Sequence, residues 1–356
     1  MRGQVPDLRC REGTPAEGAA VLCDYPRSAR GYERPGANQS WQMEWTPQRI
    51  GVRWMLCRRE EERIVRKLGL RDGSGDLARR HPIIDFHVHP GFSRSHRDQR
   101  EVMERILREA RFHHVERLCV SALGDLAESP TPAQVREAND DVLSLMSQYR
   151  EVVGFCYLNP RYPDEALQEI ERCFAAGMAG IKLLISCKAS DPLVDPIAAR
   201  AAELRAPILQ HAWYKRQGQM ENESTPADVA VLAARHPATM IVMAHLTGAG
   251  ERGITEIAPY ENLSVDTSGS EPEAGITEMA VRKLGGRRVV FGTDASGRGY
   301  GAALGKVYGA RLPARVKALI LGGNAARLLA GRRTGGRLLA AGGSSASARQ
   351  AGRLER

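Results

Sequence analysis

A regular alternation of apolar runs with helix-length segments begins near residue 81, and it constrains the fold more than any other feature of the sequence. Many of the runs are apolar along their whole length, as residues 240–244 are. Such runs are typical of parallel strands that are covered on both faces. Eight strands are predicted, over residues 82–89, 115–122, 151–158, 179–185, 206–211, 239–245, 262–267 and 288–294.

The segments between these strands have the length and the start signals of helices. Thr225 and Pro226, for example, suit the N-cap and the first helical position. Eight strand–helix units in about 250 residues match a closed (β/α)₈ TIM barrel, so we predict this α/β fold over residues 81–330, with an open doubly wound sheet as the alternative. The predicted helices are residues 98–113, 132–149, 163–176, 195–205, 226–236, 250–259 and 272–284, with one or two more in 312–330.

The two ends of the chain do not follow this pattern. Residues 1–80 begin without sustained periodicity, and we predict a partly disordered extension with an amphipathic helix over residues 50–70. We interpret it as an adapter that packs on the barrel or as an early start of translation, with a partner-binding arm as the alternative. Residues 331–356 are rich in Gly, Ser, Ala and Arg, and we predict a disordered tail.

Charge and cysteine content argue against several classes of protein. The net charge is +9, but residues 81–330 carry 29 Lys and Arg against 30 Asp and Glu, so the positive charge of the ends says nothing about the barrel's ligand. The seven cysteines are scattered without a C-x-x-C pair, which is typical of a reducing compartment. No apolar run approaches the ~20 residues that span a bilayer. We expect a cytoplasmic protein with a small-molecule substrate and no nucleic-acid or membrane partner; because many such barrels dimerise, we also expect a homo-oligomer.

Polar residues end several of the predicted strands. In a (β/α)₈ barrel the active site forms at the C-terminal ends of the strands, so these side chains are expected to converge on one rim. Two histidines in an H-x-H pattern also lie on the same face of their strand. The residues concerned are His87 and His89 in the first strand, Lys182 in the fourth, His211 in the fifth, His245 in the sixth and Asp294 in the eighth.

This set of residues points to metal-assisted catalysis. Three imidazoles and one carboxylate, from His87, His89, His211 and Asp294, suit one Zn²⁺ ion, with Mn²⁺ or Fe²⁺ as alternatives. A bound divalent ion lowers the pKa of water to about 7. Asp294 would either coordinate or take the proton of that water, and His245 would polarise the substrate or shuttle a proton.

Short motifs in a fixed order extend this interpretation across residues 82–330. They are Asp85-Phe86-His87-Val88-His89, Gly180-Ile181-Lys182-Leu183, His211, Ala244-His245, Val265-Asp266-Thr267-Ser268-Gly269, Gly292-Thr293-Asp294 and Gly323-Asn324-Ala325-Ala326-Arg327-Leu328-Leu329. As a set they resemble the amidohydrolase superfamily, in the amidohydrolase-related branch that includes aminocarboxymuconate-semialdehyde decarboxylase.

The resemblance implies one metal ion held by His87, His89, His211 and Asp294, with His245 catalytic. It implies hydrolysis of a small, anionic amide, ester or lactone as the first expectation, and non-oxidative decarboxylation of an aromatic or enol carboxylic acid as the alternative. Both reactions use the same metal ligands, so the ligand set alone does not choose between them.

Lys182 leaves a further alternative open. Other branches of the superfamily carry a carboxylated lysine at this position that bridges two metal ions, and His245 would then bind the second ion. We favour instead a Lys182 that contacts an anionic substrate or a local carboxylate. Lys188 and Arg298, in the segments 186–195 and 296–301 that follow two strands, are further candidates for binding substrate.

Two interpretations from other classes compete with this one. Residues 248–253 match G-x-G-x-x-G after an apolar strand, and Asp266 ends the next strand, which is compatible with a dinucleotide-binding turn. Only about eight residues are left for the crossover helix, however, which is short for that unit. The second is a catalytically inactive barrel that serves as a binding module.

Overall fold

The structure is a computed structural model, and it describes residues 81–91, 96–124, 128–269 and 273–330. The predicted extension with its helix over residues 50–70, and the predicted tail, lie outside this part of the chain. No helix in the described residues is long and apolar enough to cross a membrane.

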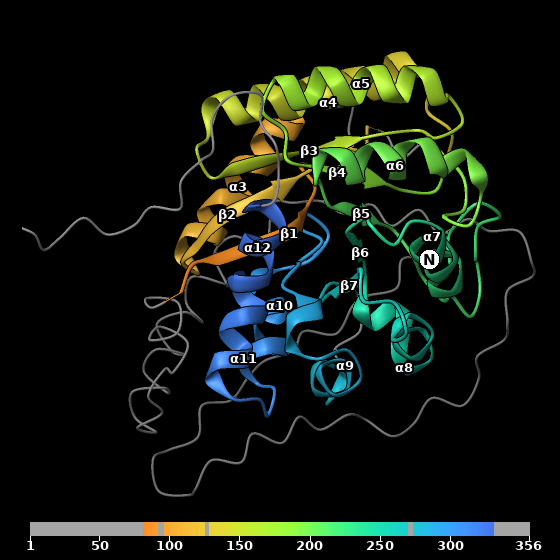
Figure 1. The fold of residues 1–356 in the computed structure, drawn as a ribbon. Coiled ribbons are helices and arrows are strands. Elements are labelled where there is room, and N and C mark those ends of the chain that lie inside the picture. Colours follow the sequence, from red (N-terminus) through yellow and green to blue (C-terminus); the bar gives the residue numbers. More distant parts are fainter. Residues whose placement is uncertain (1–80, 92–95, 125–127, 270–272, 331–356) are drawn as a thin grey trace, which may run out of the picture. The chain divides into compact units, whose positions relative to one another are not determined.

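Eight parallel strands form one sheet in which each strand pairs with the next along the chain (Figure 1). Every strand lies inside a range predicted from the sequence. The strands are β1 (Ile83–Val88), β2 (Val115–Val120), β3 (Val152–Tyr157), β4 (Gly180–Leu183), β5 (Ile208–Gln210), β6 (Ile241–Met243), β7 (Leu263–Asp266) and β8 (Val289–Val290).

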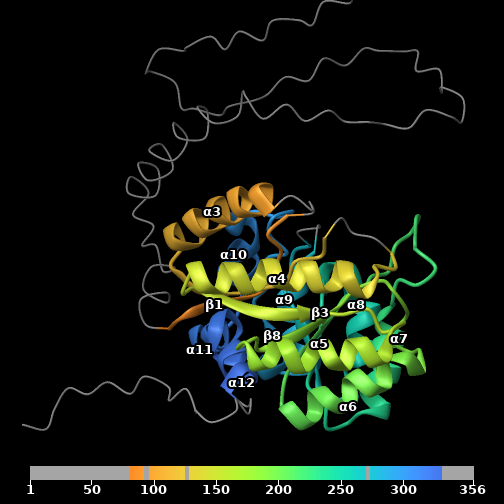
Figure 2. The same cartoon turned by 90° about the horizontal axis from the view of Figure 1, so that it is seen from above.

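Helices follow the strands and lie outside them, as the view from above shows (Figure 2). Thr131 and Thr225 cap α4 and α7 with the reciprocal side-chain bonds of a capping box. The helices are α3 (His96–Phe112), α4 (Pro132–Gln148), α5 (Pro163–Ala175), α6 (Asp195–Leu204), α7 (Pro226–Arg235), α8 (Leu246–Ile257), α9 (Ile276–Leu284), α10 (Tyr300–Tyr308), α11 (Ala314–Ala318) and α12 (Asn324–Ala330).

Three helices differ from the predictions by more than two residues. Helix α8 begins at Leu246, four residues before the predicted start, and is kinked at Gly250, whose φ of 60° is non-helical. Helix α9 begins at Ile276, four residues after the predicted start. Helix α10 was not predicted, because its region is rich in glycine, which disfavours helices. Burial of Tyr300, Leu304 and Val307 stabilises it instead.

The apolar core has two layers. The larger lies between the strands and the surrounding helices. The smaller fills the inside of the barrel, where the rings of Phe86 and Phe155 meet edge to face with centroids 5.1 Å apart. Ala325 and Leu328 of α12 belong to this inner layer. The inside of the barrel at the level of this layer is therefore filled by apolar side chains.

Hydrogen bonds join β1 to the chain around β8 and complete the barrel. Phe86 N donates to the carbonyl of Phe291 at 2.9 Å, and Asp294 N donates to the carbonyl of His87 at 2.8 Å. The buried Asp85 carboxylate accepts from Thr293 N at 3.0 Å and from Thr293 Oγ1 at 2.6 Å. Because Asp85 and Thr293 flank His87 and Asp294, this seam also sets the positions of site residues.

Candidate active site

A cavity of about 340 Å³ lies at the C-terminal ends of the strands, a size that accommodates a small organic molecule. It contains all four predicted metal ligands and His245. Its lining consists of His87, His89, Leu123, Lys182, Leu184, His211, Trp213, Lys215, Glu223, His245, Asp294 and Arg298. The convergence predicted from the strand ends is therefore present.

Three of the predicted ligands meet at one point in this cavity. The Nε2 atoms of His87 and His89 are 3.0 Å apart. Asp294 Oδ1 lies 3.6 Å from each of them. The three atoms fall within 4.8 Å of one another and form a group that could hold a metal ion.

The other nitrogen of each of these two rings is engaged by an oxygen acceptor. His87 Nδ1 donates to Asp266 Oδ2 at 2.8 Å, and His89 Nδ1 donates to the carbonyl of Ser121 at 2.7 Å. Protons on Nδ1 leave the lone pairs of His87 and His89 on the two Nε2 atoms that face each other. Burial lowers the pKa of both rings well below the usual value, so both are neutral, the form that binds metal.

The donor set fits a divalent ion. Two nitrogens that bind one tetrahedral Zn²⁺ at about 2.0–2.1 Å are roughly 3.3 Å apart, close to the spacing between His87 and His89. Two lone pairs at this distance repel each other unless a positive charge lies near them. The ammonium of Lys182 lies 3.1 Å from His87 Nε2.

His211 lies in the same cavity but outside that three-residue group. Its Nε2 contacts Glu223 Oε1 at 2.8 Å, and its Nδ1 faces His245 Nε2 at 3.1 Å. With Nε2 held by a carboxylate, the lone pair of His211 is on Nδ1, which faces the inside of the cavity. Its place as a fourth ligand remains a prediction.

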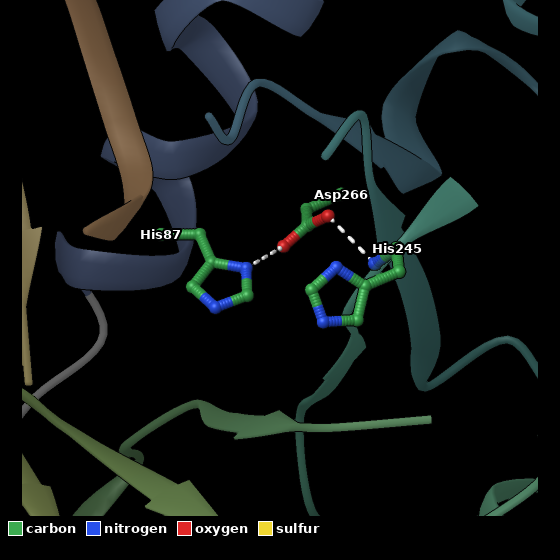
Figure 3. Close-up of side chains that lie close together, drawn as sticks. All are labelled: His87, His245 and Asp266. Atoms are coloured by element: carbon green, nitrogen blue, oxygen red, sulfur yellow. Dashed lines mark hydrogen bonds and ion pairs between the residues drawn. The ribbon is translucent and has the colours of Figure 1, made fainter. Parts of the chain in front are cut away.

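Asp266 connects the two sides of the site, as Figure 3 shows. Its Oδ2 accepts from the ring of His87, and its Oδ1 accepts from the backbone N–H of His245 at 2.9 Å. His245 has a left-handed backbone, with φ 73°, at the junction of β6 and α8. Its Nδ1 lies 2.9 Å from Ser268 Oγ, and the Trp213 ring covers it at 4.8 Å between centroids. Asp266 thereby helps to orient both a predicted ligand and the predicted catalytic histidine.

The predicted substrate-binding cations are not all in the cavity. Lys182 is fully buried there, and burial lowers its pKa to about 8. Arg298 also lines the cavity. Lys188 is exposed and is not among the lining residues. Lys215, which is close to Trp213 in sequence, lines the cavity, and its Nζ lies 2.8 Å from Glu223 Oε1.

Asp294 is partly exposed, and the pKa of its carboxyl is raised. Its side chain is 19% exposed, and burial raises the pKa of its carboxyl to about 6. A group with such a pKa exchanges protons readily near neutral pH.

Two of the three glycines of residues 248–253 have packing roles. A Cβ on Gly248 would lie 2.6 Å from the indole of Trp213, and one on Gly253 would lie 2.6 Å from Pro226. They belong to α8 and form no loop between strand and helix, and Asp266 is occupied by His87. The interpretation as a dinucleotide-binding turn is therefore wrong.

Sequence reasoning missed two carboxylates. Asp266 ends a strand as Asp294 does, so the same criterion would have found it; the sequence indicated it only within the motif of residues 265–269 and as part of a dinucleotide site, without a role at the metal centre. Glu223 lies in an irregular stretch between β5 and α7, where spacing carries no information about direction. Its contact with His211 is visible only in the folded chain.

Comparison with known proteins places the chain among barrel enzymes. A family model described as amidohydrolase matches residues 84–331. No curated protein matches significantly. Similar solved structures include a dihydroxybenzoic acid decarboxylase from Polaromonas sp. with bound manganese and 2-nitroresorcinol (17% identity over 70% of this chain and 97% of that chain, TM-score 0.58). A second is 5-carboxyvanillate decarboxylase from Sphingomonas paucimobilis (19% identity over 64% of this chain and 83% of that chain, TM-score 0.55). A third is 4-oxalomesaconate hydratase from Rhodopseudomonas palustris (16% identity over 69% of this chain and 95% of that chain, TM-score 0.52). At these identities the likeness establishes a shared fold.

Proposed function

Because the chain belongs to the amidohydrolase family, whose model it matches over the whole barrel, we propose that it is a metal-dependent decarboxylase of a small aromatic or enol carboxylic acid. Hydrolysis, the first expectation from the sequence, is the second candidate. Two of the proteins with similar solved structures are named as decarboxylases of aromatic carboxylic acids, which supports decarboxylation as the first candidate.

The observation that carries the proposal is the buried cation Lys182. Its ammonium lies beside the His87–His89–Asp294 group. Asp294 and Asp266 attract it, but within the described residues neither carboxylate lies within ion-pair distance of it. A buried charge is costly unless an opposite charge accompanies it. A substrate carboxylate would supply a closer opposite charge, and this supports the binding of an organic anion next to the predicted metal ligands.

His87, His89, His211 and Asp294 would hold the ion, with Zn²⁺ as the first choice and Mn²⁺ as the alternative. When bound, the ion supplies Lewis-acid polarisation of a substrate oxygen.

The chain's own residues would carry out the rest of the reaction. Lys182 holds the carboxylate, and Trp213 with Leu123 covers the apolar part of the substrate. The bond from the ring or enol carbon to the carboxylate breaks, CO₂ leaves, and the electron pair stays on that carbon. The carbon then takes a proton from Asp294 or His245, so one proton is consumed for each CO₂ released.

A substrate screen tests this proposal. Purified protein is stripped of metal, loaded with Zn²⁺ or Mn²⁺, and incubated in D₂O with a panel of small aromatic and enol carboxylic acids. We expect CO₂ release and one deuterium on the carbon that carried the carboxylate. Lys182→Met keeps the length of the side chain. It should bind metal at least as well as the wild type, because a positive charge beside the ligands is gone. It should lower kcat/KM at least 100-fold, because the substrate carboxylate loses its positive partner.

Hydrolysis is supported by the position of Asp294. Its carboxylate is 19% exposed and lies 3.6 Å from the Nε2 atoms of His87 and His89, where it could take a proton from a water molecule in the cavity. The same loaded protein is therefore tested on lactones, amides and esters in ¹⁸O-labelled water. Label in the product together with no CO₂ from any acid would reject the decarboxylase and establish the hydrolase.

A further inference from the structure

We infer that Glu223 is a positioning residue of the metal centre, which holds the ring of His211 with Nδ1 directed into the cavity. This inference rests on the proposed metal-dependent function and adds a residue that no sequence motif indicated.

The contact geometry is specific. Glu223 is 1% exposed, and its Oε1 lies 2.8 Å from His211 Nε2. Its Oε2 accepts from Gln219 Nε2 at 3.1 Å and from Met220 N at 3.3 Å. Both carboxylate oxygens are therefore engaged, and the side chain has a defined direction.

A carboxylate at Nε2 determines which nitrogen of His211 can bind a cation. The proton is on Nε2, where the carboxylate accepts it, and the lone pair is on Nδ1. Nδ1 faces His245 Nε2 across the cavity at 3.1 Å. Carboxylates that contact the second nitrogen of a metal-binding histidine orient the ring and raise its basicity. Glu223 stands in that relation to His211, as Asp266 does to His87.

Lys215 separates two roles that the carboxylate might have. Its Nζ lies 2.8 Å from the same Oε1 atom, and its side chain is 32% exposed. Removing Lys215 takes away an ion pair within the chain between β5 and α7 but leaves the contact between Glu223 and His211. A variant at Lys215 therefore tests whether anchoring of this segment affects metal binding, while the contact between the Glu223 carboxylate and the His211 ring stays in place.

The experiment measures Zn²⁺ and Mn²⁺ affinity of metal-free protein by competition with a chelating indicator. We expect Glu223→Ala to weaken binding 10- to 100-fold. Glu223→Gln should weaken it less, because the amide oxygen can still accept from Nε2. Lys215→Met, the matched control, should stay within about twofold of the wild type.

A double-mutant cycle decides whether Glu223 acts through His211. If it does, Glu223→Ala adds no further loss of affinity in a His211→Ala background. The Gln variant provides the same cycle should the Ala variant not fold, and circular dichroism of the metal-free proteins checks folding. The ¹⁵N shifts of the His211 ring should report protonated Nε2 in the wild type and a mixture of tautomers in Glu223→Ala.

The outcomes separate this inference from the proposed function. Wild-type protein that binds neither ion would reject the metal-dependent function itself. Metal binding that is unchanged in Glu223→Ala, losses that add in the double variant, or an equal loss in Lys215→Met would each reject the positioning role alone.

Discussion

His87 is the residue at which the two halves of the site meet. One ring nitrogen faces His89, Asp294 and Lys182, and the other donates to Asp266, which also binds the backbone of His245. A change at this one ring would therefore disturb both the predicted metal-binding group, which includes His89 and Asp294, and the orientation of His245. Residues farther from the junction should separate these effects.

A comparison of His89 with His245 provides such a separation. His89→Ala removes a nitrogen from the predicted metal-binding group, so we expect the metal content to fall from about one ion per chain to nearly none. His245→Ala should keep the metal and lose turnover by at least 100-fold. Elemental analysis and activity of the two purified variants check this. Two ions per chain, with one lost in His245→Ala, would instead support the binuclear alternative with a carboxylated Lys182.

At the scale of elements, strand ends were predictable and the connections were not. His87, His89, His211, His245 and Asp294 were found because each follows an apolar run, and a barrel brings all such ends together. The direction of each ring depends on partners far away in sequence, such as the carbonyl of Ser121 for His89. Helix α10 escaped prediction for a related reason, since tertiary packing stabilises it against its glycine content.

The packing of α4, α5 and β3 depends on one buried carboxylate. Glu169 on α5 accepts from Asn139 Nδ2 on α4 at 3.0 Å and from Arg172 Nε at 2.8 Å. Asn139 also donates to the carbonyl of Tyr157 in β3 at 3.0 Å. Burial opposes ionisation of Glu169, but the hydrogen bonds from Arg172 and Asn139 outweigh it and lower its pKa.

This cluster gives a pH-dependent contribution to stability. Because the folded-state pKa of Glu169 is depressed, the contribution is present above the unfolded value of about 4.3 and is lost as the pH falls through the folded value. Glu169→Gln should lower the free energy of unfolding by about 1–2 kcal/mol at pH 7, a figure reduced for the partial exposure of Arg172. Urea unfolding at pH 7 and below pH 4 checks this; a difference that stays constant with pH would contradict it.

At the scale of the whole barrel, the predicted metal ligands span the junction between its first and last strands. Strand β8 has only two residues, and the chain that follows it is joined to β1 by backbone hydrogen bonds and by those between Thr293 and Asp85. His87 lies on one side of this seam and Asp294 on the other. An ion bound to both would act as a cross-link between the first and last strands.

Removal of metal should therefore destabilise the whole fold. A ligand at 100 times its Kd adds about 2.7 kcal/mol to the free energy of unfolding, so a strong chelator should lower the Tm of wild-type protein by several degrees. His89→Ala is the control and should melt at one temperature with or without chelator. Hydrogen exchange in β1 and β8 should increase on chelation more than in β3.

The position of Glu223 has a consequence for redesigning this enzyme. In barrels the connections after the strands are the usual targets for grafting, since they contact substrate while the strands retain the chemistry. The stretch between β5 and α7 carries Trp213 and Lys215 on the cavity wall together with Glu223 against His211. Transplanting it whole would exchange substrate preference and ion affinity at once. A designer who wants a new substrate should vary Trp213 and Lys215 singly and leave the carboxylate in place.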